Sequence, residues 1–296
     1  MPRSIPDKAT TLGALLLLMG CAARALGADP DAVARGEYLA TAADCVACHT
    51  DVDHGGKPYA GGRALATPFG TFYAPNITPD LETGVGRWTD AQFLHALRDG
   101  VRADGANLFP VFPYPSYTGI TDEDGLAIKA YLFAQAPVRQ PNWAHEVSFP
   151  FSWRWLQTPW KWLFFTPGPF RPAPDRDAAW NRGAYLVTAV AHCGECHTPR
   201  NWFGAMDTSR FLAGTPHGPD GKPVPNITPD PKAGIGNWRE DDIIGVLTDG
   251  HTPDFEFVGG AMRDVVKSTS RLTDQDRRAI AIYLESIPPK PAAEKR

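Results

Sequence analysis

Two short segments carry residue types that suit the same chemistry. Residues 45–49 and 193–197 each contain two cysteines three positions apart, followed directly by a histidine. Cys-x-x-Cys-His is the attachment motif of c-type haem. Two thiols at this spacing lie on one face of a helical turn, where they can add to the two vinyl groups of a porphyrin. The histidine is then held beneath the macrocycle, where neutral imidazole binds iron.

The sequence therefore predicts two covalently bound haem c groups. The four cysteines expected to form thioether bonds are Cys45, Cys48, Cys193 and Cys196. The two histidines expected to bind iron on the proximal side are His49 and His197. A zinc site or a thioredoxin-like redox pair is the alternative for this spacing. Zinc would need further ligands, yet four of the five cysteines already belong to the two motifs.

The second axial ligand differs between the two motifs. Met262 lies well after the second motif, and its thioether is the expected sixth ligand of the second haem. Met206 is a poorer candidate because it follows the motif too closely. The position that corresponds to Met262 in the first half is Phe112, which cannot bind iron. His54 and His95 are the alternatives there, and an open or weakly bound iron is the third.

The two motifs lie in two copies of one longer pattern. The repeated segments, first copy then second, are residues 35–39 and 182–186, 75–80 and 225–230, 84–88 and 234–238, and 121–124 and 273–276. Each copy is expected to form one haem domain, residues 28–136 and residues 182–290. The predicted fold is mostly α-helical, with two tandem class I-like cytochrome c domains joined by an aromatic-rich strap.

Three helices are expected to position each motif. In the first copy, a helix near residues 32–42 precedes the motif, and a helix near 122–133 ends the domain, with apolar residues at helical spacing. Thr121 and Thr273 are suitable N-cap residues for the last helix of each copy. Gly36 and Gly183 allow close approach, so we expect the first and last helices to cross there.

Trp88 and Trp238 follow a repeated Gly-x-Gly turn and precede the middle helix of each copy. A buried indole N–H needs an acceptor. A haem propionate is one candidate, which would make both tryptophans cofactor-binding residues. A backbone carbonyl in the protein core is the alternative.

Residues 137–181, between the copies, have a different composition. They hold six of the nine tryptophans, together with several phenylalanines and prolines. Exposing so many aromatic side chains on a flexible linker would be costly. We expect a strap that packs against both domains. The alternative is a surface for a membrane, a quinone or a partner subunit.

The first 27 residues have the layout of a secretory signal peptide, with basic residues, a short apolar run and small residues before Ala28. Residues 18–21 also resemble a lipobox, in which Cys21 would be lipidated and would anchor the protein to a membrane. Both interpretations predict a periplasmic protein. The net charge of −4 and the lack of a basic patch indicate no nucleic-acid partner. Residues 291–296 form a short polar tail.

The chain resembles the multihaem cytochrome c subunits of bacterial periplasmic dehydrogenases, such as alcohol and gluconate dehydrogenases. The resemblance rests on the two haem motifs, the paired Asn-Ile-Thr-Pro-Asp segments and the segment at residues 180–186. It implies electron transfer from a periplasmic dehydrogenase subunit to a downstream carrier, oxidase or quinone, without substrate chemistry in this chain. Because Phe112 replaces methionine, the alternative is a peroxidase-like or thiosulfate-oxidising dihaem enzyme whose first haem is the reactive centre.

Overall fold

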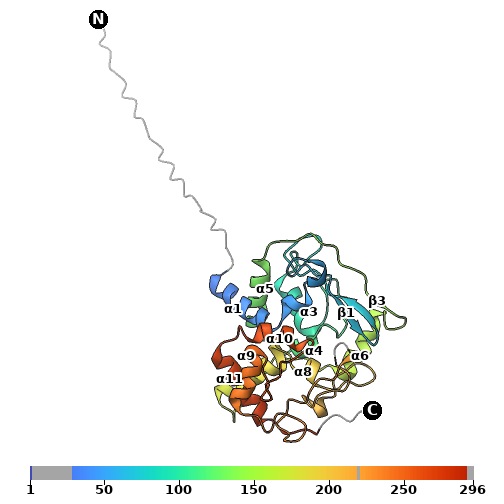
Figure 1. Cartoon of the computed structure of the whole chain (residues 1–296). Coiled ribbons are helices and arrows are strands. Elements are labelled where there is room, and N and C mark those ends of the chain that lie inside the picture. The colour runs from blue at the N-terminus through green and yellow to red at the C-terminus, as the bar shows by residue number, and fades with distance from the viewer. Residues whose placement is uncertain (2–28, 219–220, 292–296) are drawn as a thin grey trace.

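A computed structural model describes residue 1, residues 29–218 and residues 221–291 (Figure 1). The predicted signal peptide after Met1, with Cys21, and the predicted tail after residue 291 lie outside the described residues. Helices dominate the structure, which confirms a mostly α-helical fold.

In its described residues, the first half contains five α-helices, one 3₁₀ turn and a hairpin. These are α1 (Pro30–Ala42), α2 (Cys45–Cys48), the 3₁₀ turn η1 (Val52–His54), β1 (Ala64–Thr67), β2 (Gly70–Tyr73), α3 (Asp90–Asp99), α4 (Tyr114–Tyr117) and α5 (Asp122–Phe133). The described residues of the second half repeat this order, with an isolated antiparallel bridge between Thr215 and Val224 instead of the two paired strands. It contains α7 (Ala178–Tyr185), the π-helical turn η3 (Leu186–Val190), α8 (Gly194–His197), η4 (Thr208–Arg210), α9 (Glu240–Asp249), α10 (Met262–Thr269) and α11 (Asp274–Ser286).

A small sheet was not expected from the sequence. β1 and β2 form an antiparallel hairpin, and the two-residue strand β3 (Glu146–Val147) adds to the free edge of β2. Strands of two to four residues are too short to show a clear alternation of apolar and polar side chains. The sheet therefore left no usable pattern in the sequence.

The first and last helices of each half cross at a glycine, as predicted. A Cβ atom at Gly36 would lie 1.9 Å from the carbonyl oxygen of Ala127 in α5. A Cβ at Gly183 would lie 1.9 Å from the carbonyl oxygen of Ala279 in α11. The N-caps of the last helices are also confirmed, since the Thr121 and Thr273 hydroxyls each accept a hydrogen bond from the backbone three residues on.

The two halves are joined by a reciprocal set of hydrogen bonds. The Asp124 carboxylate accepts hydrogen bonds from Arg35 of its own half (2.6 Å) and from the Tyr185 hydroxyl of the other half (2.5 Å). The same arrangement occurs with the halves exchanged, formed by Asp276, Arg182 and Tyr38. We call these two sets the interdomain clasp. The repeated Arg-Gly-x-Tyr and Thr-Asp-x-Asp segments therefore supply the hydrogen bonds of this clasp.

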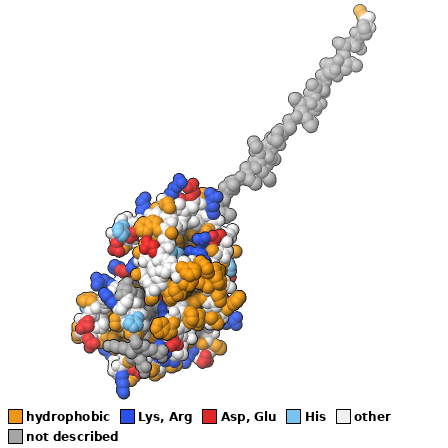
Figure 2. Space-filling model, turned by 90° about the vertical axis from the view of Figure 1, so that its right-hand side faces the viewer, with side chains coloured by type: hydrophobic (Ala, Val, Ile, Leu, Met, Phe, Trp, Pro, Cys, Tyr) orange, Lys and Arg blue, Asp and Glu red, His pale blue; other side chains and the backbone are white. Residues whose placement is uncertain are grey.

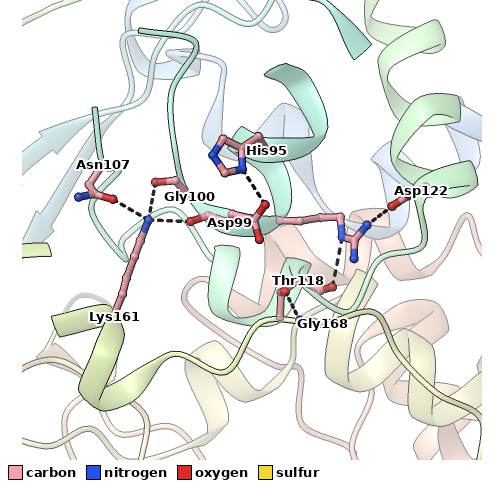
Figure 3. Close-up of polar contacts among 9 residues, drawn as sticks. His95, Asp99, Gly100, Asn107, Thr118, Asp122, Lys161 and Gly168 are labelled. Carbon is pink, nitrogen blue, oxygen red and sulfur yellow. Dashed lines mark hydrogen bonds and ion pairs between the residues drawn. The ribbon is translucent and has the colours of Figure 1, made fainter. Parts of the chain in front are cut away.

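Residues 137–181 contact both halves. The segment contains β3, η2 (Arg154–Leu156) and α6 (Gln157–Phe164). The Lys161 ammonium donates to the carbonyl oxygens of Asp99 and Gly100 at the end of α3, at 2.7 and 3.0 Å (Figure 3). The indole of Trp160 donates to the carbonyl oxygen of Phe203 in the second half (2.8 Å).

Within the described residues, no helix combines the length and the apolar character needed to cross a lipid bilayer.

Candidate haem sites

The cysteines of each motif lie on one short helical turn at the end of a longer helix. Cys45 and Cys48 are the first and last residues of α2, and the backbone N–H of His49 donates to the carbonyl oxygen of Cys45 (3.0 Å). His197 makes the same bond to Cys193 (3.0 Å). Both turns therefore place two thiols on one face and direct the histidine back beneath them, which is the arrangement that haem attachment requires.

Both candidate proximal histidines are oriented by a proline carbonyl. The Nδ1 atom of His49 lies 2.7 Å from the carbonyl oxygen of Pro75, and that of His197 lies 2.8 Å from that of Pro225. Burial lowers the pKa of both imidazoles, so each is neutral and donates its Nδ1–H. The Nε2 lone pair is then available for iron. The residues present therefore fit a haem group at each turn.

The segment after each of these prolines is held by a buried asparagine and threonine. The Asn76 side chain donates to the carbonyl oxygen of Val138 (2.7 Å) and accepts from the Thr78 hydroxyl (2.7 Å). Asn226 and Thr228 make the equivalent bonds in the second half, with the carbonyl oxygen of Lys290. The sequence shows the repeated Pro-Asn-Ile-Thr segments, but it does not show that their proline carbonyls contact the histidines.

The thiols have the wrong environment for a redox pair or a zinc site. Burial raises the pKa of Cys45 and of Cys193 to about 12. A reactive redox pair instead needs a lowered pKa, because the thiolate is the active form. In the described part of the chain, no group of three or more His, Cys, Asp or Glu side chains could hold a metal ion.

The residues at the predicted sixth-ligand position differ between the halves. Met262 is half-buried at the start of α10. Phe112 packs against Tyr117, with ring centroids 5.6 Å apart, and lies against the hydrophobic core. The role of Met262 as the sixth ligand of the second haem stays a prediction.

His54 and His95, the histidines considered as sixth ligands of the first haem, are largely exposed. The His54 side chain is 79% exposed and contacts Asp51. His95 is 54% exposed and its Nδ1 lies 2.7 Å from the Asp99 carboxylate (Figure 3). His145 accepts a hydrogen bond from a backbone N–H at Nδ1, so its Nε2 carries the proton and is not available as a ligand. A bond donated at Nδ1 leaves Nε2 available, as in His49, so it is the exposure of His54 and His95 that argues against either as the sixth ligand of the first haem.

Comparison with known proteins agrees with this geometry. The Cytochrome c family matches residues 33–135. A diheme cytochrome c-type protein of Cereibacter sphaeroides is 40% identical, over 93% of this chain and 96% of that protein. The cytochrome c subunit of the quinone alcohol dehydrogenase of Komagataeibacter europaeus is 44% identical, over 95% of this chain. A nicotinate dehydrogenase subunit of Pseudomonas putida is 45% identical, over 88% of this chain.

The chain belongs to the c-type cytochrome family. It is related both to a dihaem cytochrome and to the cytochrome c subunits of dehydrogenases. The cytochrome spans only 61% of the length of the alcohol dehydrogenase subunit and 22% of the nicotinate dehydrogenase subunit. Membership of the family implies covalently bound haem c.

Trp88 and Trp238 lie just before α3 and α9 of the cytochrome, as predicted, and pack against the core. No hydrogen bond joins either indole nitrogen to another of the described residues, so the alternative of a backbone carbonyl partner finds no support. A propionate partner for these two tryptophans stays a prediction.

Proposed function

We propose that this cytochrome binds two haem c groups and transfers electrons from a dehydrogenase subunit to a downstream carrier, oxidase or quinone. The observation that carries the proposal is the duplicated histidine geometry, in which two neutral imidazoles are each held at Nδ1 by a proline carbonyl. Such a fixed ligand favours electron transfer because little rearrangement accompanies a change of charge on the iron. When bound, haem supplies one-electron oxidation and reduction.

Each haem group is held by its own set of residues. Cys45 and Cys48 in the first half form the thioether bonds, and His49 binds the iron. Their counterparts in the second half are Cys193, Cys196 and His197. Met262 completes the second site, where a thioether raises the reduction potential. Trp88 and Trp238 donate to a propionate of the nearer haem.

A large exposed aromatic surface is the docking site that we assign to the dehydrogenase subunit. It consists of Trp143, Phe149, Phe151, Trp153, Trp155, Trp162, Leu163, Trp202 and Phe203, each at least 46% exposed. Hydrophobic side chains gather on the face that carries β3 and α6 (Figures 1 and 2). Contiguous apolar patches of this kind mark interaction sites. In this role, residues 137–181 are a strap that fixes the two domains and presents the surface.

The charges of this surface favour a protein partner over a lipid bilayer. Residues 143–165 contain three charged side chains, Glu146, Arg154 and Lys161. Glu146 accepts from the Tyr73 hydroxyl, while Arg154 and Lys161 donate to backbone carbonyl oxygens. Helices that lie on anionic membranes instead present free basic side chains. Membrane association through this surface or through lipidated Cys21 is the alternative.

Purification from the native host tests the proposed partner. A dehydrogenase subunit should copurify with the tagged cytochrome at low and at high salt, and its substrate should reduce the haem absorbance. The double variant Trp162→Ala/Leu163→Ala should lose the partner, while Phe255→Ala, which alters an exposed ring elsewhere, should keep it. Binding of the wild-type cytochrome to phosphatidylglycerol vesicles without any dehydrogenase would contradict this assignment.

The proposed location is the periplasm. It is supported by the layout of residues 1–27 and by the haem attachment motifs. Cell fractionation with N-terminal sequencing tests it: the haem protein should be released with the periplasmic contents and should begin at Ala28. Lipidated Cys21 at the N-terminus would identify the membrane-anchored form, and a cytoplasmic haem protein would contradict both.

A second candidate function rests on the first haem. Phe112 replaces the expected thioether, and the side chains of His54 and His95 are largely exposed. An open iron there would give a dihaem enzyme of the peroxidase-like or thiosulfate-oxidising kind. Electron paramagnetic resonance distinguishes the two: an open site gives a high-spin signal and binds cyanide, whereas a pure electron carrier gives two low-spin signals.

A further inference from the structure

One short helix contacts the attachment turns of both halves. Tyr117, the last residue of α4, is buried, with 5% of its surface exposed. Its hydroxyl donates to the carbonyl oxygen of Ala43 (3.1 Å), which lies two residues before Cys45. The first attachment turn is therefore bonded directly to α4.

The same helix contacts the second attachment turn from its other side. The edge of the Tyr117 ring meets the imidazole of His192, with centroids 5.2 Å apart and planes at 67°. His192 immediately precedes Cys193. The neighbouring Ser116 hydroxyl donates to the carboxylate of Glu195 (2.6 Å), which lies between the two cysteines of the second motif. Tyr117 thus lies between the two turns.

This bridge occurs once in the described structure and is not repeated by the second half. Thr269 is the counterpart of Tyr117, because its carbonyl oxygen accepts a hydrogen bond from Leu272 just before α11, as that of Tyr117 does from Ile120 just before α5. The Thr269 hydroxyl donates to the carbonyl oxygen of Leu247 in its own half. Ser268 donates to Asp44 beside the first attachment turn (2.7 Å). That polar contact touches one turn alone, and it provides a matched control.

We propose that electrons pass between the two haem domains at the contact of Tyr117 with His192. The inference rests on the proposed function, since it needs two haem groups that exchange electrons. One electron lost by ferrous iron in one domain is gained by ferric iron in the other. Tyr117 and His192 undergo no net oxidation and release no proton.

The environment of the contact suits this role. Burial raises the pKa of Tyr117 well above its usual value and lowers the pKa of His192. Both rings are therefore neutral at physiological pH, and no charge must move in them when an electron crosses. Tyr117 is only 5% exposed, so little solvent reaches its side of the contact.

Flash photoreduction of the oxidised, haem-loaded protein tests the inference. A concentration-independent phase should follow the first reduction as the electron moves between the haem groups. Tyr117→Leu and His192→Asn should each slow this phase by about tenfold. Asparagine is chosen because residue 192 has a φ of 43°, which asparagine tolerates. Tyr117→Phe keeps the ring and should retain the wild-type rate, as should the control Ser268→Ala.

The midpoint potentials of both haem groups should stay unchanged in these variants, which separates the route from a change in driving force. If Tyr117→Leu does not take up both haem groups, His192→Asn decides alone. Wild-type rates in the ring-deleting variants, or an equal slowing in Ser268→Ala, would overturn the inference. Absence of the internal phase in the wild-type protein would instead overturn the two-haem relay on which it depends.

Discussion

At the scale of single residues, each candidate site depends on a histidine and the carbonyl group that orients it. The attachment motifs identify His49 and His197 from sequence alone, because the chemistry requires a fixed spacing. The orienting groups, the carbonyl oxygens of Pro75 and Pro225, could not be predicted. A backbone carbonyl has the same chemistry at every residue, so only the fold determines which one meets the imidazole.

Asn76, the residue after Pro75, should be important for stability. Asn76→Ala removes the donor to the carbonyl oxygen of Val138 and the acceptor for the Thr78 hydroxyl. Loss of these buried partners should lower the free energy of unfolding by about 1–3 kcal/mol, measured by denaturant titration of the haem protein. Asn237→Ala, which removes an exposed side chain bonded to the carbonyl oxygen of Pro231, should change it by less than about 0.5 kcal/mol.

Asp44 should make stability depend on pH. Burial raises the pKa of Asp44 to about 6. The folded state then binds a proton more tightly than the unfolded state, so this group's contribution to stability is lost as pH rises from about 4 to 6. Asp44→Asn removes this loss and keeps an acceptor for Ser268. The variant should gain about 1–3 kcal/mol relative to wild type between these pH values; a constant difference across the range would contradict the assignment.

At the scale of helices, local patterns in the sequence were enough to predict the main helices of each copy. The first, middle and last helices of each copy, the threonine N-caps and the glycine crossings were predicted, because periodicity and capping are local signals, whereas α4, α6 and α10 were not. The hairpin and the proline carbonyls were missed because they depend on contacts between distant residues. The contacts of the connecting segment with both halves were expected, whereas the exposure of most of its tryptophans fits the alternative of a partner or membrane surface.

The glycine crossing gives a direct test at this scale. Gly36→Ala would place a methyl group 1.9 Å from the carbonyl oxygen of Ala127, so α1 and α5 must separate. We expect a loss of at least about 3 kcal/mol in the free energy of unfolding, as for other severe core changes. Gly245→Ala in α9 meets no atom closer than 3.9 Å and should instead stabilise the protein by about 0.5–1 kcal/mol.

At the scale of the whole molecule, the two halves form one unit through the interdomain clasp. The duplicated segments were visible in the sequence, but their pairing was not. Tyr38 and Asp276 are separated by 238 residues, and no periodicity indicates that a tyrosine in one copy meets an aspartate in the other. The same residues that stabilise each half also join it to its partner half.

The clasp should make unfolding cooperative. Tyr38→Phe and Tyr185→Phe each remove a hydrogen bond to a carboxylate, which should cost about 1.5–3 kcal/mol apiece. In the double variant, the single calorimetric transition should broaden, because two bonds that couple the halves are lost while those of Ser116 with Glu195 and of Ser268 with Asp44 remain. Tyr73→Phe, which removes an exposed hydroxyl bonded to Glu146, should keep the width of the wild-type transition.

The central claim is that both attachment turns carry covalent haem. It is tested most directly by the intact mass of the protein after maturation in the periplasm, together with its pyridine haemochrome spectrum. The account predicts the mass of the processed polypeptide plus two haem groups, and plus one in Cys45→Ala/Cys48→Ala. A mass equal to the bare polypeptide, or to one haem group in the wild-type protein, would contradict it.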